Sequence, residues 1–142
     1  MARQPTYAGT WLLLPELCLY EEGDPPESGV YSVEWKDGRA DISISWQASD
    51  GHSHNISFGG PSDGTRQPTG SDVPSHPSIS HVDQYTLDSR AFDRDNEIAY
   101  ARRTASRDGE LLVTVQAGRR PDGTQFHNFQ VYKRGGRERN DA

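Results

Sequence analysis

The sequence predicts an all-β protein, an antiparallel up-and-down barrel of eight or nine strands. Asp-Gly pairs recur along the chain at positions 37–38, 50–51, 63–64, 108–109 and 122–123. Between runs that alternate apolar and polar residues, Asp-Gly is the strongest local signal for a β-hairpin. Helical periodicity is almost absent, and short turns join one run to the next. These features favour an up-and-down barrel over a sandwich, because a sandwich needs longer crossovers.

The composition agrees with one curled sheet. A chain of 142 residues forms one domain, and only 32% of its residues are hydrophobic. In a single curled sheet one face of each strand can stay in water, so the fold needs fewer hydrophobic residues than a sheet covered by helices. Three Trp, six Tyr and four Phe argue against disorder. We expect a flexible N-terminus over residues 1–8, a barrel domain over residues 9–134 and a flexible tail over residues 135–142.

The clearest strand covers residues 40–47, where Ala40, Ile42, Ile44 and Trp46 share one face. The other strands are expected at residues 9–14, 30–35, 52–58, 79–88, 97–106, 110–117 and 125–134. Residues 16–20 fit either one helical turn or an edge strand, and residues 59–77 read as a long flap rich in Gly and Pro.

The parity of the last strand stays open. Its apolar residues Phe129 and Val131 favour one inward face, whereas Gln130 and Tyr132 would point inward in the other register. Only one of these arrangements can hold in a regular strand.

Charge and targeting signals exclude several classes of function. The net charge of −6 speaks against a nucleic-acid binder, and no apolar window reaches the length of a membrane span. We interpret the arginine-rich stretches as solvated strand edges and a frayed end; these are Arg102-Arg103, Arg119-Arg120 and residues 134–139.

The lone Cys18 excludes an intrachain disulfide and is interpreted as a small packed hydrophobe. No leader of signal-peptide length is seen, so we expect a cytoplasmic protein, with export open for a chain that has lost its leader.

Both ends of the chain resemble a known family pattern. Gly9-Thr10-Trp11 opens the first strand, and Tyr132-Lys133-Arg134 closes the last. This is similar to the calycin pattern of lipocalins and fatty-acid-binding proteins, in which a G-x-W tryptophan packs against a basic residue of the final strand. The resemblance implies that Trp11 and Arg134 close the barrel through a cation on an indole face.

A longer likeness covers most of the chain. The motifs S-W-x-x-x-D-G-H-x-H-x-x-S-F, R-R-x-x-S-x-D-G-x-L-x-V-T-V and P-D-G-x-x-F-x-N-F-x-V-Y-K-R follow one another. Their order resembles small bacterial lipocalin-like proteins, most of which have no established activity. Fatty-acid-binding proteins commonly place R-x-Y in the last strand to hold a carboxylate. The matching positions here are Gln130-Val131-Tyr132, so that charged anchor is missing from the strand.

The inward face of the predicted barrel is apolar and aromatic, as ligand sites usually are. We therefore expect the protein to bind a small, partly apolar molecule without a cofactor, as a monomer or homodimer. The candidate contacts are Trp35, Trp46, His54, Phe58, Tyr100, Gln130 and Tyr132.

Two alternatives remain open. His52 and His54 point the same way on one strand and could hold zinc or haem with His76, His81 or His127, in a small enzyme or metal protein. The barrel could instead be filled and act through protein–protein contacts. No nucleophile elbow, phosphate loop or spaced metal motif occurs, which favours binding over catalysis.

Overall fold

The structure, a computed structural model, describes residues 4–66, 77–93 and 96–135. Its elements are β1 (Gly9–Leu13), the 3-10 helix η1 (Pro15–Leu17), β2 (Leu19–Tyr20), β3 (Ser28–Lys36), β4 (Arg39–Gln47), β5 (Ser53–Pro61), β6 (Ser78–Asp83), β7 (Thr86–Asp93), β8 (Asn96–Ala105), β9 (Leu111–Arg119) and β10 (Gln125–Gly135). Across these ranges, no helix is long and apolar enough to cross a membrane.

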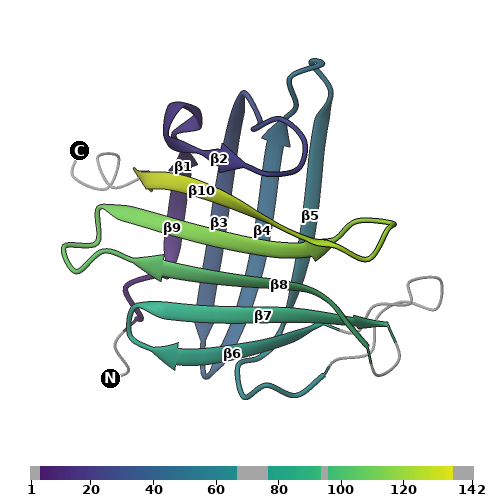
Figure 1. Cartoon of the computed structure of the whole chain (residues 1–142). Helices are drawn as coiled ribbons and strands as arrows, with labels where there is room; N and C mark the ends of the chain where they lie inside the picture. The colour runs from purple at the N-terminus through teal and green to yellow at the C-terminus, as the bar shows by residue number, and fades with distance from the viewer. Residues whose placement is uncertain (1–3, 67–76, 94–95, 136–142) are drawn as a thin grey trace.

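The strands form one antiparallel meander. Their order is β5-β4-β3-β1-β10-β9-β8-β7-β6, and the short β2 pairs with β10 beside β1. Figure 1 shows β1, β3, β4 and β5 running across β6 to β10, so the two halves of the sheet face each other at a steep angle. Asp63 and Ser80 bridge the seam between β5 and β6. The predicted up-and-down barrel is confirmed, with nine strands in its wall.

The inner faces of the two halves enclose the core. Tyr7, Trp11, Ile42, Leu87 and Leu112 are fully buried there. Alternation along each strand sets this pattern, because every second side chain points inward. The prediction for residues 40–47 is accordingly met at Ala40 and Ile42, which are both fully buried.

Arg134 ties the N-terminal segment to the barrel. Its guanidinium lies 3.9 Å from the centre of the Trp11 ring, the contact that the resemblance implied. Its Nη1 and Nη2 atoms donate to the carbonyls of Ala8 (2.6 Å) and Thr6 (2.7 Å). Tyr7 is fully buried. The flexibility expected of residues 1–8 stays a prediction: residues 6–8 take part in these contacts, and residues 1–3 lie outside the described chain.

Gly135, the first residue of the tail predicted over residues 135–142, is the last residue of β10 and is buried. The remaining tail residues are outside the described ranges, as are residues 67–76 of the predicted flap. Between β1 and β3 the chain forms both features considered for residues 16–20, a single turn in η1 and the edge strand β2.

Residues 79–88 form a hairpin and not the single strand predicted. β6 ends at Asp83, the chain turns at Gln84-Tyr85, and β7 starts at Thr86. The Asp83 carboxylate accepts a hydrogen bond of 2.8 Å from the backbone N–H of Tyr85. An Asx turn of this kind needs neither Gly nor Pro, so the sequence carries no Gly or Pro signal for a turn at this position.

The same turn chemistry makes stability depend on pH. Hydrogen bonds from the Tyr85 backbone to Asp83, and from the Thr124 side chain and backbone to Asp122, lower the pKa of both carboxyls in the folded protein. Stability from such a group is present above its unfolded pKa and is lost as the pH falls through the lower folded pKa. We expect the melting temperature to fall as the pH drops below 3.8, the ordinary value for aspartate.

The variant Asp83→Asn with Asp122→Asn should show a shallower fall in melting temperature, because asparagine keeps the turn but does not titrate. Thermal unfolding followed by circular dichroism from pH 7 to pH 2 measures this. Asp24→Asn, in an exposed loop, is the matched control and should keep the wild-type profile. An unchanged slope in the double variant contradicts the assignment.

Candidate ligand-binding site

The two ends of the barrel interior are packed differently. At the end near the N-terminus, Val33 and Ile42 are buried among other core side chains. Further along the same strands, Ile44 faces inward opposite Ile56, and Ile56 is 47% exposed. An inward-facing isoleucine with that exposure shows that solvent reaches the second end, which we call the open end.

Small side chains face Ile44 and Ile56 from the other half of the sheet. The inner positions of β7 and β8 toward the open end are Ser89, Ala91, Ala99 and Ala101, and those of β9 are Gln116 and Gly118. Ala99 is exposed and Ala101 is half-buried. Apart from Gln116, the side chains on this wall are short, whereas those of the facing wall are larger and apolar.

Arg103 lies where this small-residue wall meets the packed core. It points inward from β8, is only 2% exposed, and donates from Nε to the hydroxyl of Tyr31. Its guanidinium also lies 5.6 Å from the centre of the Tyr31 ring. The Nη1 atom is buried with no hydrogen-bond partner, and none of the ion pairs in the described residues includes Arg103. Among the described residues, the buried positive charge of Arg103 therefore has no counter-charge.

Neutral polar groups lie beside Arg103 in the same cross-strand row. Thr114 pairs with Arg103 on one side and with Gln130 on the other, and its hydroxyl donates to Gln130 Oε1 at 2.8 Å. The hydroxyl of Tyr132 donates to the same oxygen at 3.3 Å, and Gln130 Nε2 donates to the Tyr20 hydroxyl. Burial raises the pKa of Tyr20 and of Tyr132, so both phenols stay neutral at physiological pH.

Cys18 is half-buried and donates from Sγ to the carbonyl of Leu14 at 3.5 Å. Burial raises the pKa of its thiol, so the thiolate is disfavoured. This surrounding agrees with the interpretation of Cys18 as a packed side chain.

The structure settles the parity of the last strand. Gln130 and Tyr132 face inward with exposures of 8% and 2%, whereas Phe129 is 38% exposed on the outer face. Gln130 is held by three neighbouring side chains, so it orders the polar row.

Of the other predicted contacts, Trp46 and His54 lie together on the inner face at the open end. Their rings stack with centres 5.2 Å apart and 22° between planes. Phe58 packs against the core, and Trp35 lies at the packed end, edge-on to Tyr7 with ring centres 6.1 Å apart. Trp46 and His54 thus lie at the open end, whereas Phe58, which pairs with Ile42, and Trp35 pack against the core.

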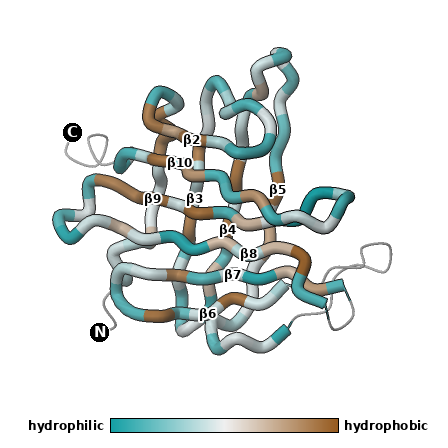
Figure 2. Tube along the Cα trace, viewed as in Figure 1, coloured by the Kyte–Doolittle hydropathy of each residue, from teal (hydrophilic) through white to brown (hydrophobic). Residues whose placement is uncertain are grey.

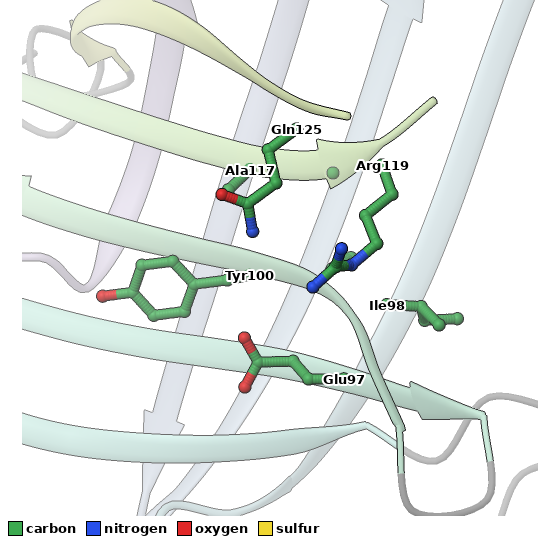
Figure 3. A pocket seen from close by; sticks show the side chains of 8 residues that line it. Glu97, Ile98, Tyr100, Ala117, Arg119 and Gln125 are labelled. Carbon is green, nitrogen blue, oxygen red and sulfur yellow. The ribbon is translucent and has the colours of Figure 1, made fainter. Parts of the chain in front are cut away.

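Tyr100 is on the wrong face for the predicted role. Its hydroxyl donates to Asp88 at 3.2 Å on the outer surface, and the Arg90 guanidinium lies 4.7 Å from its ring centre. Figure 3 shows it beside a hollow of about 70 Å³ at the ends of β8 and β9, together with Glu97 and Arg119. Ligand pockets usually measure about 300–1,000 Å³, so this hollow is too small for one.

The histidines are dispersed. His52 pairs with Asp50 at 3.1 Å in an exposed turn, His81 Nδ1 lies 2.5 Å from the Tyr7 hydroxyl, and His127 Nδ1 is 3.6 Å from Glu21. His76 falls outside the described residues. Within those residues, no group of three or more His, Cys, Asp or Glu side chains could hold a metal ion.

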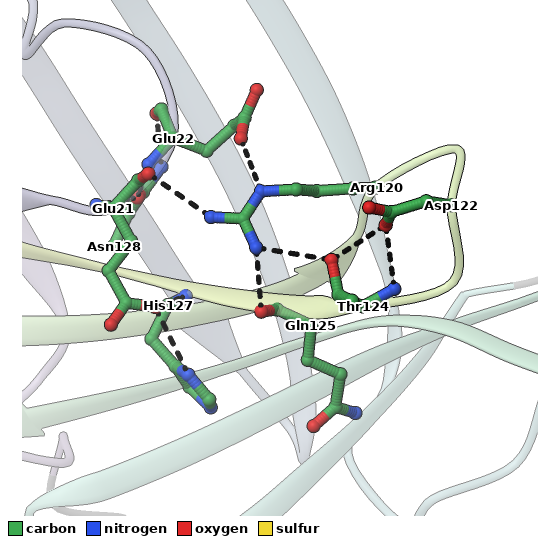
Figure 4. A network of polar contacts seen from close by, with 8 residues as sticks. All are labelled: Glu21, Glu22, Arg120, Asp122, Thr124, Gln125, His127 and Asn128. Atoms are coloured by element: carbon green, nitrogen blue, oxygen red, sulfur yellow. Dashed lines mark hydrogen bonds and ion pairs between the residues drawn. The ribbon is translucent and has the colours of Figure 1, made fainter.

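A polar network anchors the loop that follows β2. Asn128 Oδ1 accepts the backbone N–H groups of Glu21 (2.9 Å) and Glu22 (3.1 Å), and Arg120 Nε donates to the Glu22 carboxylate at 2.8 Å. Figure 4 shows these groups joining the loop to the β9–β10 hairpin. The partners are about 100 residues apart in sequence, so no local pattern predicts the network.

Arg103 is the principal residue that the sequence interpretation missed. The sequence interpretation placed Arg102 and Arg103 on a solvated strand edge. This is wrong for Arg103, which is buried, whereas Arg102 faces outward and forms an ion pair with Asp88 at 2.7 Å. The available signal was parity: Ala99, Ala101 and Ala105 are small residues at the same alternate positions as Arg103.

The comparisons with known proteins support the fold. No protein-family model and no curated protein matches the chain. A crystal structure of a mutant of the fluorescent protein UnaG aligns with 16% identity and a TM-score of 0.61, over 92% of this chain and 97% of that one. The siderocalin Ex-FABP, whose description gives it dual ligand specificities, aligns with 12% identity and a TM-score of 0.49, over 92% of this chain and 74% of that one. With its up-and-down strand order, this chain has a calycin-type β-barrel fold.

Proposed function

We propose that the protein binds a small molecule with an anionic group and an apolar body, inside the open end of the barrel. The observation that carries this proposal is the buried Nη1 atom of Arg103, which has no partner among the described residues. A carboxylate, sulfonate or phosphate oxygen would supply both the missing acceptor and the missing negative charge.

Energetics support an anion over a neutral ligand. Burying an unpaired charge costs several kcal/mol in practice, and a single hydrogen bond to a neutral phenol offsets only part of that cost. Within the described part of the chain, Arg103 has a single side-chain hydrogen bond, to Tyr31. An ionised group beside Nη1 would gain a charge-assisted hydrogen bond in a site that is shielded from water.

The walls favour an apolar body. Ile44, Ile56 and the Trp46–His54 stack lie on one side of the open end, and small residues together with Gln116 lie on the other. A ligand lying there would cover Ile56, which is now 47% exposed. Gln130 and Tyr132, two of the contacts expected from the sequence, stand in the polar row at the anionic end.

The test is a fluorescence titration with 8-anilinonaphthalene-1-sulfonate, which carries one anionic group on an aromatic body. We expect saturable binding to the wild type and at least a tenfold weaker affinity for Arg103→Gln. Dodecanoate should displace the probe, and dodecanol should do so much less well, because the alcohol has no charge for the guanidinium.

Arg119→Gln is the matched control, since it removes the same charge from an exposed position on the neighbouring strand β9. Its affinity should equal that of the wild type. Equal affinities of Arg103→Gln and the wild type would refute the proposed role of Arg103, and equal displacement by dodecanoate and dodecanol would refute an anion site.

A further inference from the structure

The outer face of the barrel carries one apolar region that the proposed ligand site does not use. Cross-strand pairing places three residues each from β9 and β10 beside Leu12 of β1 and Leu19 of β2, and the backbone N–H of Leu14, which follows β1, donates to the Val131 carbonyl. We call these nine positions the outer block: Leu12, Leu14, Leu19, Leu111, Val113, Val115, Phe129, Val131 and Lys133. Eight are apolar and the ninth is Lys133. In Figure 2 the hydrophobic colour gathers along β2, β10 and β9 in the same region.

Exposure in this block is high. Leu19 is 67% exposed, Leu111 is 42% exposed, and Val113 and Phe129 are each 38% exposed. The outer side of an antiparallel sheet that faces water normally alternates to polar residues, and strands apolar on both faces are typical of sheets covered on both sides. A contiguous patch of this kind on a chain with so few hydrophobic residues marks an interaction surface.

We propose that the outer block is the interface of a symmetric homodimer. The patch is self-complementary, as a twofold interface requires, because the same apolar surface is presented by both copies. Its ends also carry opposite charges. Lys133 lies at one end, and Glu21, whose backbone N–H donates to His127, borders the other.

The charges select one arrangement of the two copies. If the β10 strands of the two copies run antiparallel across the interface, each Lys133 comes next to the partner copy's Glu21 end. With β10 strands parallel, like charges would face one another, which is unfavourable. The structure thus points to antiparallel face-to-face packing with an apolar centre and paired charges at both rims.

Other occupants fit less well. The sequence that follows β10, residues 136–142, is Gly-Arg-Glu-Arg-Asn-Asp-Ala and has no large apolar side chain to cover the block. A membrane surface is disfavoured because the chain carries a net charge of −6 and cytoplasmic leaflets are anionic.

The experiment is sedimentation equilibrium of the wild type, Val113→Lys and Val82→Lys. Val113 lies within the block, and Val82 is an apolar residue on β6 outside it that is 48% exposed. We expect the wild type and Val82→Lys to sediment at twice the chain mass of 15.8 kDa. Val113→Lys should raise the dimer dissociation constant at least tenfold, with an unchanged far-ultraviolet circular dichroism spectrum.

A charge exchange tests the arrangement. Lys133→Glu should weaken the dimer, and adding Glu21→Lys should restore it. A monomeric wild type overturns the proposal, as does a Val113→Lys protein that stays as dimeric as Val82→Lys. Absence of restoration overturns the antiparallel packing. A monomer that sediments with phosphatidylcholine–phosphatidylserine vesicles would assign the block to a membrane and also overturn the dimer.

Discussion

Replacing the half-buried Arg134 with methionine is expected to lower the free energy of unfolding by about 3–5 kcal/mol, because each backbone carbonyl left without its donor costs about 1–3 kcal/mol. The guanidinium donates to the carbonyls of Ala8, Thr6 and Gly109 at 2.6, 2.7 and 2.9 Å. It also lies over the indole of Trp11, 3.9 Å from the ring centre. Methionine fills similar space but leaves three carbonyls without donors, so the loss is one of polar pairing and not of volume.

The physical consequence extends to the N-terminal segment. Residues 6–8 are held to the barrel by Arg134 and by the bond of Trp11 Nε1 to the Tyr7 carbonyl. Without the guanidinium, the fully buried Tyr7 should become accessible to solvent. Urea unfolding followed by tryptophan fluorescence measures the stability, and hydrogen exchange of residues 6–8 measures the local release.

Arg119→Met serves as the control, because Arg119 is exposed and its side chain donates a long hydrogen bond, 3.4 Å to the carbonyl of Gly123. It should change stability by less than about 0.5 kcal/mol, as surface substitutions usually do. If Arg134→Met were as stable as this control, the account of Arg134 as the clamp between the chain ends would fail.

The double substitution Arg103→Met with Tyr31→Phe is expected to do the opposite, raising the free energy of unfolding by about 1–3 kcal/mol. Replacing buried ionic groups with apolar ones of similar volume is often stabilising, by about 1–4 kcal/mol. Here the guanidinium has no counter-charge among the described residues, and removing the Tyr31 hydroxyl together with it avoids a new unpaired group. The same variant should lose binding of 8-anilinonaphthalene-1-sulfonate, because the anion has no cation to meet.

A gain in stability joined to a loss of binding distinguishes a functional group from a structural one. Urea unfolding and probe titration on the same samples give both quantities. The single variant Tyr31→Phe is the control, since it keeps the charge and should retain most of the affinity for the probe. A double variant that is less stable than the wild type by more than 1 kcal/mol would show that Arg103 supports the fold, and would remove the main support for an anion site.

Turn signals and alternation were enough to predict the barrel, because both are local properties of the chain. Gly9 is constrained in both ways: its φ of +127° is a local feature that suits glycine, whereas a Cβ there would collide with Arg134 Nη1 from the last strand, which no local pattern shows. The hairpin at Gln84-Tyr85 was missed because its turn is built by the Asp83 side chain without Gly or Pro.

The candidate site was only partly predictable. Trp46, His54, Gln130 and Tyr132 follow from strand parity and family resemblance, and they lie on the inner face. Tyr100 and Arg103 were assigned by residue type, an aromatic inward and an arginine outward, and both assignments were wrong. Since inward and outward positions differ by one residue, a strand face is fixed by its pairing with neighbours, which the sequence alone does not show.

The most direct measurement of the central claim is the side-chain nuclear magnetic resonance spectrum of protein labelled with ¹⁵N-arginine, with the Arg103 Nε–H signal assigned from its absence in Arg103→Gln. Titration with dodecanoate should shift this signal saturably, while titration with dodecanol should leave it in place. Dodecanoate that binds without moving the Arg103 signal would contradict the claim that the buried guanidinium receives an anionic ligand.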